Sequence, residues 1–269
     1  MIHSVLKAAV ESKPAQKLLV RLHESKAGKR FLNRVTFPRG VFDTFEEAVA
    51  AAAKTAKPGH ENPGNAVTHW NLASALLISD YPVLYWMNQA GNDLKVLDYG
   101  GNVGNLYHAY RNHLRAKKLE WTVSDLPMMI EAGRTIAKEK STTSELRFRV
   151  SSDPFPDVNF ALLCGSYHYW EGTASDFVAR FPAPPKHILI NRSPMVDGEV
   201  KEHATVQFSQ YCALPCIIRN KRDIAAAFEL AGYRLVDSWL CPEYSVKKSL
   251  FPRQSLDHCS GLYFQRKDG

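Results

Sequence analysis

The spacing of hydrophobic residues changes partway along the chain, near residue 90. Before that point, apolar positions recur at intervals of three and four residues, which predicts helices. After it, short apolar runs alternate with amphipathic stretches. The short runs predict seven strands, at about residues 95–99, 121–124, 147–150, 160–164, 187–191, 233–239 and 260–264. Helices are expected near residues 104–117, 127–140, 173–180 and 221–231.

Strands that alternate with helices in this way are typical of an α/β protein with a doubly wound, mainly parallel sheet. We therefore expect a Rossmann-like domain over residues 91–269, preceded by a helical N-terminal extension over residues 1–90 that covers its pocket like a lid. Within the extension, residues 68–78 are predicted to be helical, and Asp80-Tyr-Pro82 is predicted to interrupt that helix before it continues.

The composition is that of an ordinary globular protein, with 45% hydrophobic and 23% charged residues among 269. No run approaches the about 18 apolar residues of a membrane helix, and no secretory signal is recognisable, so we expect a cytoplasmic protein. The five cysteines form an odd number without the paired spacing of a metal site. Free thiols and no bound metal are therefore expected.

The chain carries a formal charge of +7, from 34 basic and 27 acidic residues. Such a charge attracts anionic partners, nucleic acid included. The basic residues are scattered, however, and the sequence holds no basic stripe interleaved with aromatic residues. A solvated basic surface is the better interpretation, and nucleic acid is not the predicted partner.

The stretch Val96-Leu-Asp-Tyr-Gly-Gly-Asn-Val-Gly104 carries the strongest chemical signal, because it predicts a strand, a glycine-rich turn and a helix start. A nicotinamide fingerprint requires glycine where this chain has Tyr99. The acidic Asp98 suits a ligand with an ammonium group better than a pyrophosphate, since like charges repel. The residues expected to contact the cofactor here are Asp98, Tyr99, Gly100, Gly101, Asn102 and Gly104.

Acidic residues also follow the next two predicted strands. Asp125 stands 21 positions after Gly104, where a carboxylate can accept the hydroxyl groups of a ribose. The alternative is that Asp125 caps the helix that opens at Leu126-Pro127. After the third strand, Ser152 and Asp153 are placed to meet an adenine amino group, although a turn cap before Pro154 explains them equally well.

The order of residues from Asp98 to Gly104 resembles motif I of class I S-adenosylmethionine-dependent methyltransferases, which binds the methionine end of that cofactor. Asn102 departs from the usual pattern, because glycine is common there. After the fourth strand, Cys164-Gly-Ser-Tyr-His-Tyr-Trp170 resembles the His-Asp-Trp segment of small-molecule O-methyltransferases. His168 and Trp170 match that segment and Tyr169 replaces its aspartate.

This second resemblance implies that His168 is the general base, whereas the alternative is a histidine packed among aromatic residues. Cys164 and Gly165 complete the expected cofactor site. The residues expected to line the acceptor pocket are Tyr81, Tyr167, Tyr169, Asn191 and Arg192. A surface ion pair explains Arg192 as well as an anionic substrate does.

A wider pattern is similar to a family of uncharacterised bacterial methyltransferases, which are associated with surface-polysaccharide or specialised-metabolite pathways. It covers residues 38–265 through Gly40-Val-Phe, Phe45-Glu-Glu-Ala48, Ser79-Asp-Tyr-Pro82, Ile190-Asn-Arg-Ser-Pro194, Thr205-Val-Gln207 and Gly232-Tyr-Arg-Leu-Val-Asp-Ser-Trp239. The resemblance implies S-adenosylmethionine as cofactor and O-methylation of a small-molecule or sugar-like acceptor.

Two alternatives remain open at the level of sequence. The first is a nucleic-acid methyltransferase, motivated by the net charge, although no base-flipping motif follows the fourth strand. The second is a non-catalytic partner subunit with the same fold, which Asn102 in the glycine loop would accommodate. The oligomeric state also stays open, with a homodimer as one arrangement.

Overall fold

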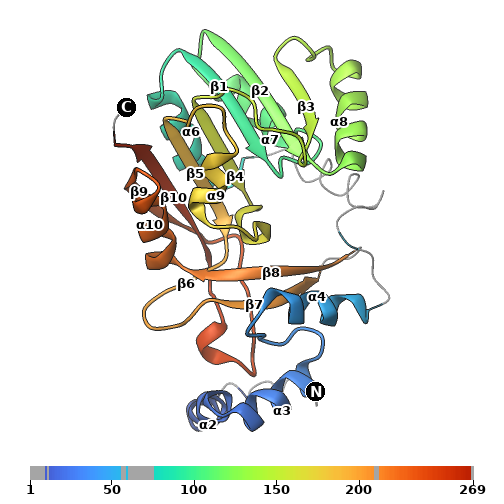
Figure 1. The fold of residues 1–269 in the computed structure, drawn as a ribbon, viewed down its shortest axis with the longest axis vertical. Helices are drawn as coiled ribbons and strands as arrows, with labels where there is room; N and C mark the ends of the chain where they lie inside the picture. The colour runs from blue at the N-terminus through green and yellow to red at the C-terminus, as the bar shows by residue number, and fades with distance from the viewer. Residues whose placement is uncertain (1–9, 11, 56–58, 60–75, 209–211, 268–269) are drawn as a thin grey trace.

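The computed structural model describes residues 10, 12–55, 59, 76–208 and 212–267. The main body is a seven-stranded sheet with the strand order β3-β2-β1-β4-β5-β10-β9 (Figure 1). Strands β1 to β5 run parallel, and β10 pairs antiparallel with both β5 and β9. The strands are β1 (Asp93–Tyr99), β2 (Lys118–Asp125), β3 (Leu146–Val150), β4 (Phe160–Cys164), β5 (His187–Ser193), β9 (Tyr233–Cys241) and β10 (Cys259–Arg266).

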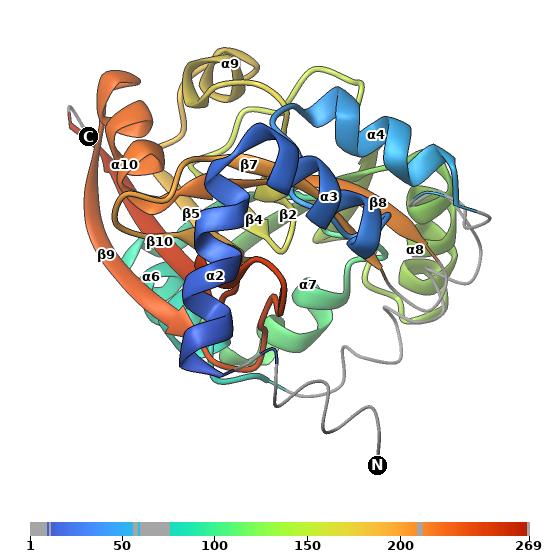
Figure 2. The same ribbon diagram turned by 90° about the horizontal axis from the view of Figure 1, so that it is seen from below.

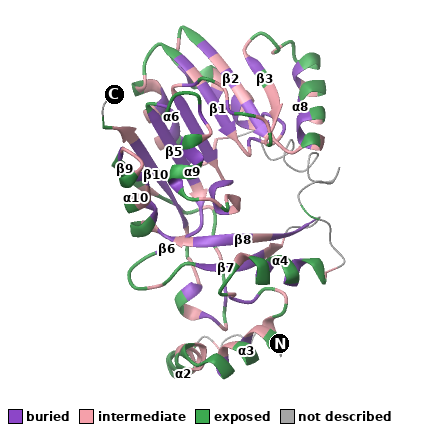
Figure 3. Ribbon diagram, in the orientation of Figure 1, coloured by how far each residue is buried: buried purple, intermediate pink, exposed green. Residues whose placement is uncertain are grey.

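All seven predicted strands are confirmed, and so is the doubly wound arrangement. Helices α6 (Asp80–Gln89), α7 (Asn105–Tyr110) and α8 (Pro127–Glu139) bury apolar side chains against one face of the sheet. Helices α9 (Ala174–Ala179) and α10 (Lys221–Leu230) cover the other face. The inner strands, such as β4, β5 and β10, are consequently almost entirely buried, while the edge strands β3 and β9 and the outer helix faces are more exposed (Figure 3).

A second sheet of three strands was not predicted from the sequence. It has the order β6-β8-β7, formed by β6 (Met195–Val196), β7 (His203–Phe208) and β8 (Ala213–Asn220). These strands have no recognisable strand pattern in the sequence. Strand β6 has only two residues, and β8 contains Pro215, which cannot donate a ladder hydrogen bond. Strand β8 runs straight into α10, whose N-cap Asn220 accepts from the backbone N–H of Arg222 at 2.9 Å.

The N-terminal helices pack on this second sheet and on the segment after β9 rather than on the main sheet. Helix α4 (Phe45–Ala53) places three alanines against Ala204, Val206 and Ala213. Helices α2 (Lys13–Glu24) and α3 (Lys26–Thr36) lie farther out, where Leu32 and Val41 bury Phe251. Figure 2 shows the two helices crossing beneath β7 and β8.

Two local expectations were wrong. Asp80-Tyr-Pro82 does not interrupt a helix but begins α6, because a proline in the first turn has no intrahelical hydrogen bond to lose. Residues 76–79 before it form no helix, and most of the helix expected at 68–78 lies outside the described residues. The helix expected at 104–117 is also shorter, since α7 ends at Tyr110 and a single 3-10 turn, Arg111–His113, follows it.

Candidate functional site

The glycine loop lies at the carboxyl end of β1, in the middle of the main sheet. The N–H of Gly100 donates to the carbonyl of Ser124 at 2.8 Å, which fixes the loop against β2. Gly100 has a φ of +69°, and a Cβ atom at this position would lie 2.4 Å from the Cβ of Ser166. Only glycine fits there without displacing the loop after β4. Asn102 also has a positive φ of 57° and is the residue at the tip of the turn.

Asp98 lies beneath this loop, fully buried. The indole N–H of Trp121 donates to its Oδ2 at 3.1 Å, and Gly101 passes directly over the carboxyl group. Within the described part of the chain, its Oδ1 has no hydrogen-bond partner. Burial raises the pKa of Asp98 to about 7, an effect that the Trp121 hydrogen bond opposes and the nearby Asp125 carboxyl reinforces.

Asp125 holds the loop from the end of β2. Its Oδ2 accepts from the backbone N–H of Asn102 at 2.7 Å, and its Oδ1 accepts from that of Leu126 at 2.6 Å. Burial raises the pKa of Asp125 to about 6, although both backbone hydrogen bonds lower it. The carboxylate therefore connects the glycine loop to the start of α8, and each oxygen keeps a lone pair for a further donor.

The loop after β3 is tied to the opposite side of the sheet. The guanidinium of Arg180 donates to the carbonyls of Ser151 and Asp153, at 2.7 and 2.8 Å. It also stacks over the Phe155 ring at 4.0 Å. Ser152 is exposed at the tip of this loop. The hydrogen bonds from Arg180 thus fix the position of the loop at which an adenine ring was expected.

The loop after β4 touches the glycine loop. The Ser166 hydroxyl donates to the carbonyl of Tyr99, and the N–H of Gly165 donates to the carbonyl of Asn191 at 2.8 Å. A 3-10 turn, Tyr167–Tyr169, follows at once. The segment that carries the candidate base is thus fixed next to the candidate cofactor loop. Cys164, at the end of β4, is a free thiol whose pKa burial raises to about 12.

The three side chains of this turn have different surroundings. Tyr167 packs into the core against Phe228, with ring centroids 6.0 Å apart. His168 is 5% exposed, and its ring centroid lies 4.1 Å from that of Tyr169. The Tyr169 hydroxyl donates to Oε1 of Gln207 on β7 at 2.9 Å. Tyr169 therefore links the turn to the second sheet, a contact between residues 38 apart in sequence.

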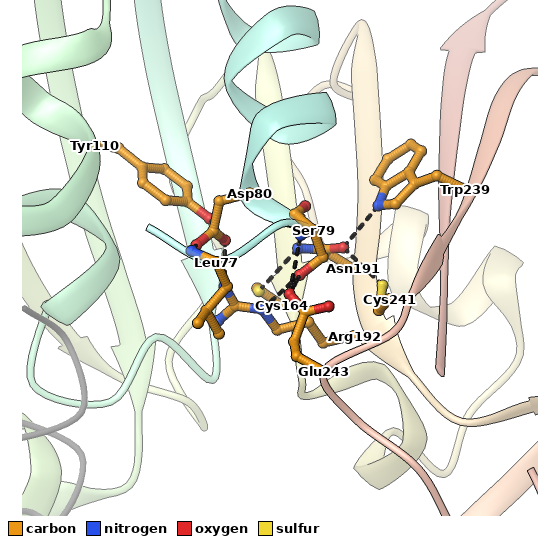
Figure 4. Close-up of polar contacts among 10 residues, drawn as sticks. All are labelled: Leu77, Ser79, Asp80, Tyr110, Cys164, Asn191, Arg192, Trp239, Cys241 and Glu243. Carbon is orange, nitrogen blue, oxygen red and sulfur yellow. Dashed lines mark hydrogen bonds and ion pairs between the residues drawn. The ribbon is translucent and has the colours of Figure 1, made fainter. Parts of the chain in front are cut away.

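Arg192 belongs to a buried polar network where β5 ends, α6 begins and the chain leaves β9 (Figure 4). It has a φ of +53°, and its guanidinium pairs with Asp80 and donates to Oγ of Ser79 at 3.1 Å. Glu243 accepts from the backbone N–H and the hydroxyl of Ser79, at 2.9 and 2.6 Å. Tyr110 donates to the same oxygen of Asp80 that Arg192 contacts.

Asn191 completes this network. Its amide donates to the carbonyl of Ser79 at 3.1 Å, and its Oδ1 accepts from the indole of Trp239 at 2.9 Å and from the Cys241 thiol at 3.3 Å. Asn191 and Arg192 are thus held by protein groups, while Tyr81 at the start of α6 is 63% exposed. Their contact with a substrate stays a prediction. Ser79, Asp80 and Glu243 were not among the expected site residues.

The described residues include neither a cluster of metal ligands nor a membrane-spanning helix. No group of three or more histidine, cysteine, aspartate or glutamate side chains there could hold a metal ion. Among the same residues, no helix is both long and apolar enough to cross a membrane.

The sequence matches no protein-family model and no curated protein. Solved structures do match. OxaC, in complex with S-adenosylhomocysteine (SAH) and oxaline, is 14% identical, with a TM-score of 0.52 over 88% of this chain and 61% of OxaC. A 1,6-didemethyltoxoflavin-N1-methyltransferase from Burkholderia thailandensis is 15% identical, with a TM-score of 0.49 over 85% of this chain and 96% of that one.

The O-methyltransferase NcsB1 from neocarzinostatin biosynthesis is 14% identical, with a TM-score of 0.43 over 76% of this chain and 59% of NcsB1. The chain therefore spans less than two thirds of the length of OxaC and NcsB1. The likeness to OxaC, together with the strand order, shows that this chain has a Rossmann-like fold with a mainly parallel seven-stranded sheet. The narrower bacterial family inferred from sequence motifs stays a prediction.

A substitution at Gly100 tests the contact that fixes the loop. We expect Gly100→Ala to lower the free energy of unfolding by roughly 1–3 kcal/mol more than Gly198→Ala does. Both glycines have a positive φ, but a Cβ atom at Gly198 meets nothing within 4 Å, so the difference isolates the clash with Ser166. Urea unfolding of both variants measures this difference in the free energy of unfolding. Equal decreases in the two variants would show that the loop shifts to accept the Cβ atom at no cost.

The raised pKa of Asp98 predicts how stability depends on pH. The folded protein holds this proton up to about pH 7, whereas the unfolded chain releases it near 3.8, so stability falls as pH rises between those values. Asp98→Asn should remove up to roughly 4 kcal/mol of that fall. The measurement is urea unfolding of both proteins from pH 4 to 8. Parallel curves for the two proteins would refute the shift.

Proposed function

We propose that this protein is an S-adenosylmethionine-dependent methyltransferase that methylates a hydroxyl group of a small-molecule or sugar-like acceptor. The observation that carries the proposal is the placement of two acidic side chains, the buried Asp98 and the partly buried Asp125, around a glycine loop at the carboxyl ends of the central strands. Ligands of doubly wound sheets bind at this edge. OxaC, which shares the fold, was solved with SAH bound.

The chemistry of the loop fits this cofactor better than a dinucleotide. Three buried oxygens around it have no hydrogen-bond partner among the described residues: Oδ1 of Asp98, Oδ1 of Asn102 and Oγ of Ser124. An ammonium group and ribose hydroxyls bring the donors that these oxygens lack. A pyrophosphate would instead bring acceptors and negative charge close to two carboxyl groups.

Each part of the cofactor then has an expected set of protein contacts. The loop from Asp98 to Gly104 would hold the amino acid end, and Asp125 with Leu126 would hold the ribose. Ser152 and Asp153 would face the adenine ring. Cys164 and Gly165 would close the site from β4, since the adjacent Ser166 already touches Gly100.

The bound cofactor supplies a methyl group on a positively charged sulfur, which is reactive without metal assistance. The protein's own contribution is to position the acceptor in line with that methyl and to exclude water. His168 would remove the acceptor's proton, since an imidazole accepts a proton near neutral pH. Its backbone lies two residues after Ser166, which bonds to the glycine loop at Tyr99.

Calorimetric titration with SAH tests the cofactor site. We expect Asp125→Asn to weaken SAH binding at least about tenfold, because the substitution removes a charged acceptor and loosens the loop bonded to it. Asp223→Asn, on the exposed first turn of α10, is the matched control and should bind like the original protein. Unchanged SAH affinity in Asp125→Asn, or binding of NADH and not SAH, would contradict the assignment.

Turnover tests the base. With any acceptor that the protein methylates, His168→Gln should lower kcat by about 10²–10⁴-fold while the affinity for SAH stays the same. His113→Gln alters an exposed histidine just past α7 and should leave kcat unchanged. Full turnover by His168→Gln would show that positioning alone suffices for the reaction.

A further inference from the structure

A cavity of about 590 Å³ lies where β7, the end of α3 and the segment 245–251 meet. This volume falls within the range of small-molecule sites. In Figure 1 the segment after β9 descends from the main sheet past β7 toward α2 and α3, so the cavity lies below the carboxyl edge of the main sheet. None of the residues discussed so far as cofactor contacts lines it.

The lining of this cavity is basic. Arg39, Lys247 and Lys248 line it, whereas none of the aspartates and glutamates that the structure describes does. Lys247 forms an ion pair with Asp257, which does not line the cavity. Arg39 is exposed and lies over the Phe208 ring at 4.9 Å, with no ion pair among the described residues.

Lys248 is the unusual member, because only 8% of its surface is exposed. Its ammonium donates to Oγ1 of Thr205 at 2.5 Å, to the carbonyl of Arg39 at 2.9 Å and to that of Gly40 at 3.4 Å. All three acceptors are neutral. A buried charge without a counter-ion is costly, and burial accordingly lowers the pKa of Lys248 to about 8. An anion in the cavity would offset this cost.

The same wall leads to the candidate base. Residues 205–208 of β7 line the cavity, and among them Thr205 and Gln207 contribute its polar groups, while Ala204 and Val206 also pack on α4. Gln207 accepts the hydrogen bond from the Tyr169 hydroxyl, and the Tyr169 ring lies against His168. One face of β7 therefore runs from the buried ammonium of Lys248 to the turn that carries His168.

We propose that this cavity binds the anionic end of the acceptor, a carboxylate or phosphate group. Lys248 and Arg39 supply the charge, and the rest of the acceptor extends along Gln207 and Tyr169 toward His168. The proposal rests on the methyltransferase function for the identity of the ligand as an acceptor. The anion site itself rests only on the cavity, its lining and the uncompensated lysine.

The test is a calorimetric titration of the full chain with inorganic phosphate, and in a parallel series with malonate, to tell phosphate from carboxylate. We expect saturable binding of at least one anion, weakened about tenfold or more in Lys248→Met and about threefold in Arg39→Gln. Lys138→Gln is the matched control, since Lys138 is an exposed lysine on α8 that does not line the cavity, and the affinity of this variant should stay within about twofold of the original. Arg39 is exposed, so Arg39→Gln carries the test if Lys248→Met does not fold.

Absence of saturable binding of both anions would overturn the proposal, and so would equal affinities in the original protein, Lys248→Met and Arg39→Gln. Titration of the same samples with SAH separates the two levels of inference. SAH binding without anion binding rejects the anion site alone. Anion binding without SAH binding rejects the methyltransferase function and leaves the anion site standing.

Discussion

The position of the glycine loop depends on the carboxylate of Asp125. Its two oxygens bond to the backbone of Asn102 and of Leu126, so one side chain fixes both the loop after β1 and the start of α8. A second carboxyl group, that of Asp98, is buried under the loop and held by Trp121. Two acidic groups so close together cost folding free energy, and a cationic ligand relieves that cost. This constraint is the reason for proposing that the loop binds a positively charged cofactor.

A second buried charge organises the rest of the site. The pair of Asp80 and Arg192 joins the beginning of α6 to the end of β5, and Ser79 connects both to Glu243 beyond β9. Removing one partner of such a pair leaves the other buried and unpaired, which costs about 3–5 kcal/mol. Through Glu243 the network holds the start of the segment that later forms the wall of the basic cavity. The buried polar network at the end of β5 and the wall of the basic cavity are therefore connected through Glu243.

The main sheet could be predicted because each strand is a short buried run whose apolar pattern is local in the sequence. The glycine loop was found for the same reason, since Asp98 to Gly104 are contiguous. The second sheet was missed, because its strands are held by pairing between residues such as Val206 and Pro215 rather than by a pattern of their own. The charge pair of Asp80 and Arg192 joins residues 112 positions apart, and no local signal reports such a contact. Lys248 was indistinguishable from its exposed neighbour Lys247 until their surroundings were known.

A crystal structure of the protein with SAH tests the central claim most directly. The account predicts the amino acid end of SAH against residues 100–104, with its ammonium group on the unpartnered oxygen of Asp98 or Asn102, and its ribose hydroxyls on Asp125. SAH bound elsewhere would contradict the account. So would a glycine loop that moves away from Asp125 and makes no contact with SAH.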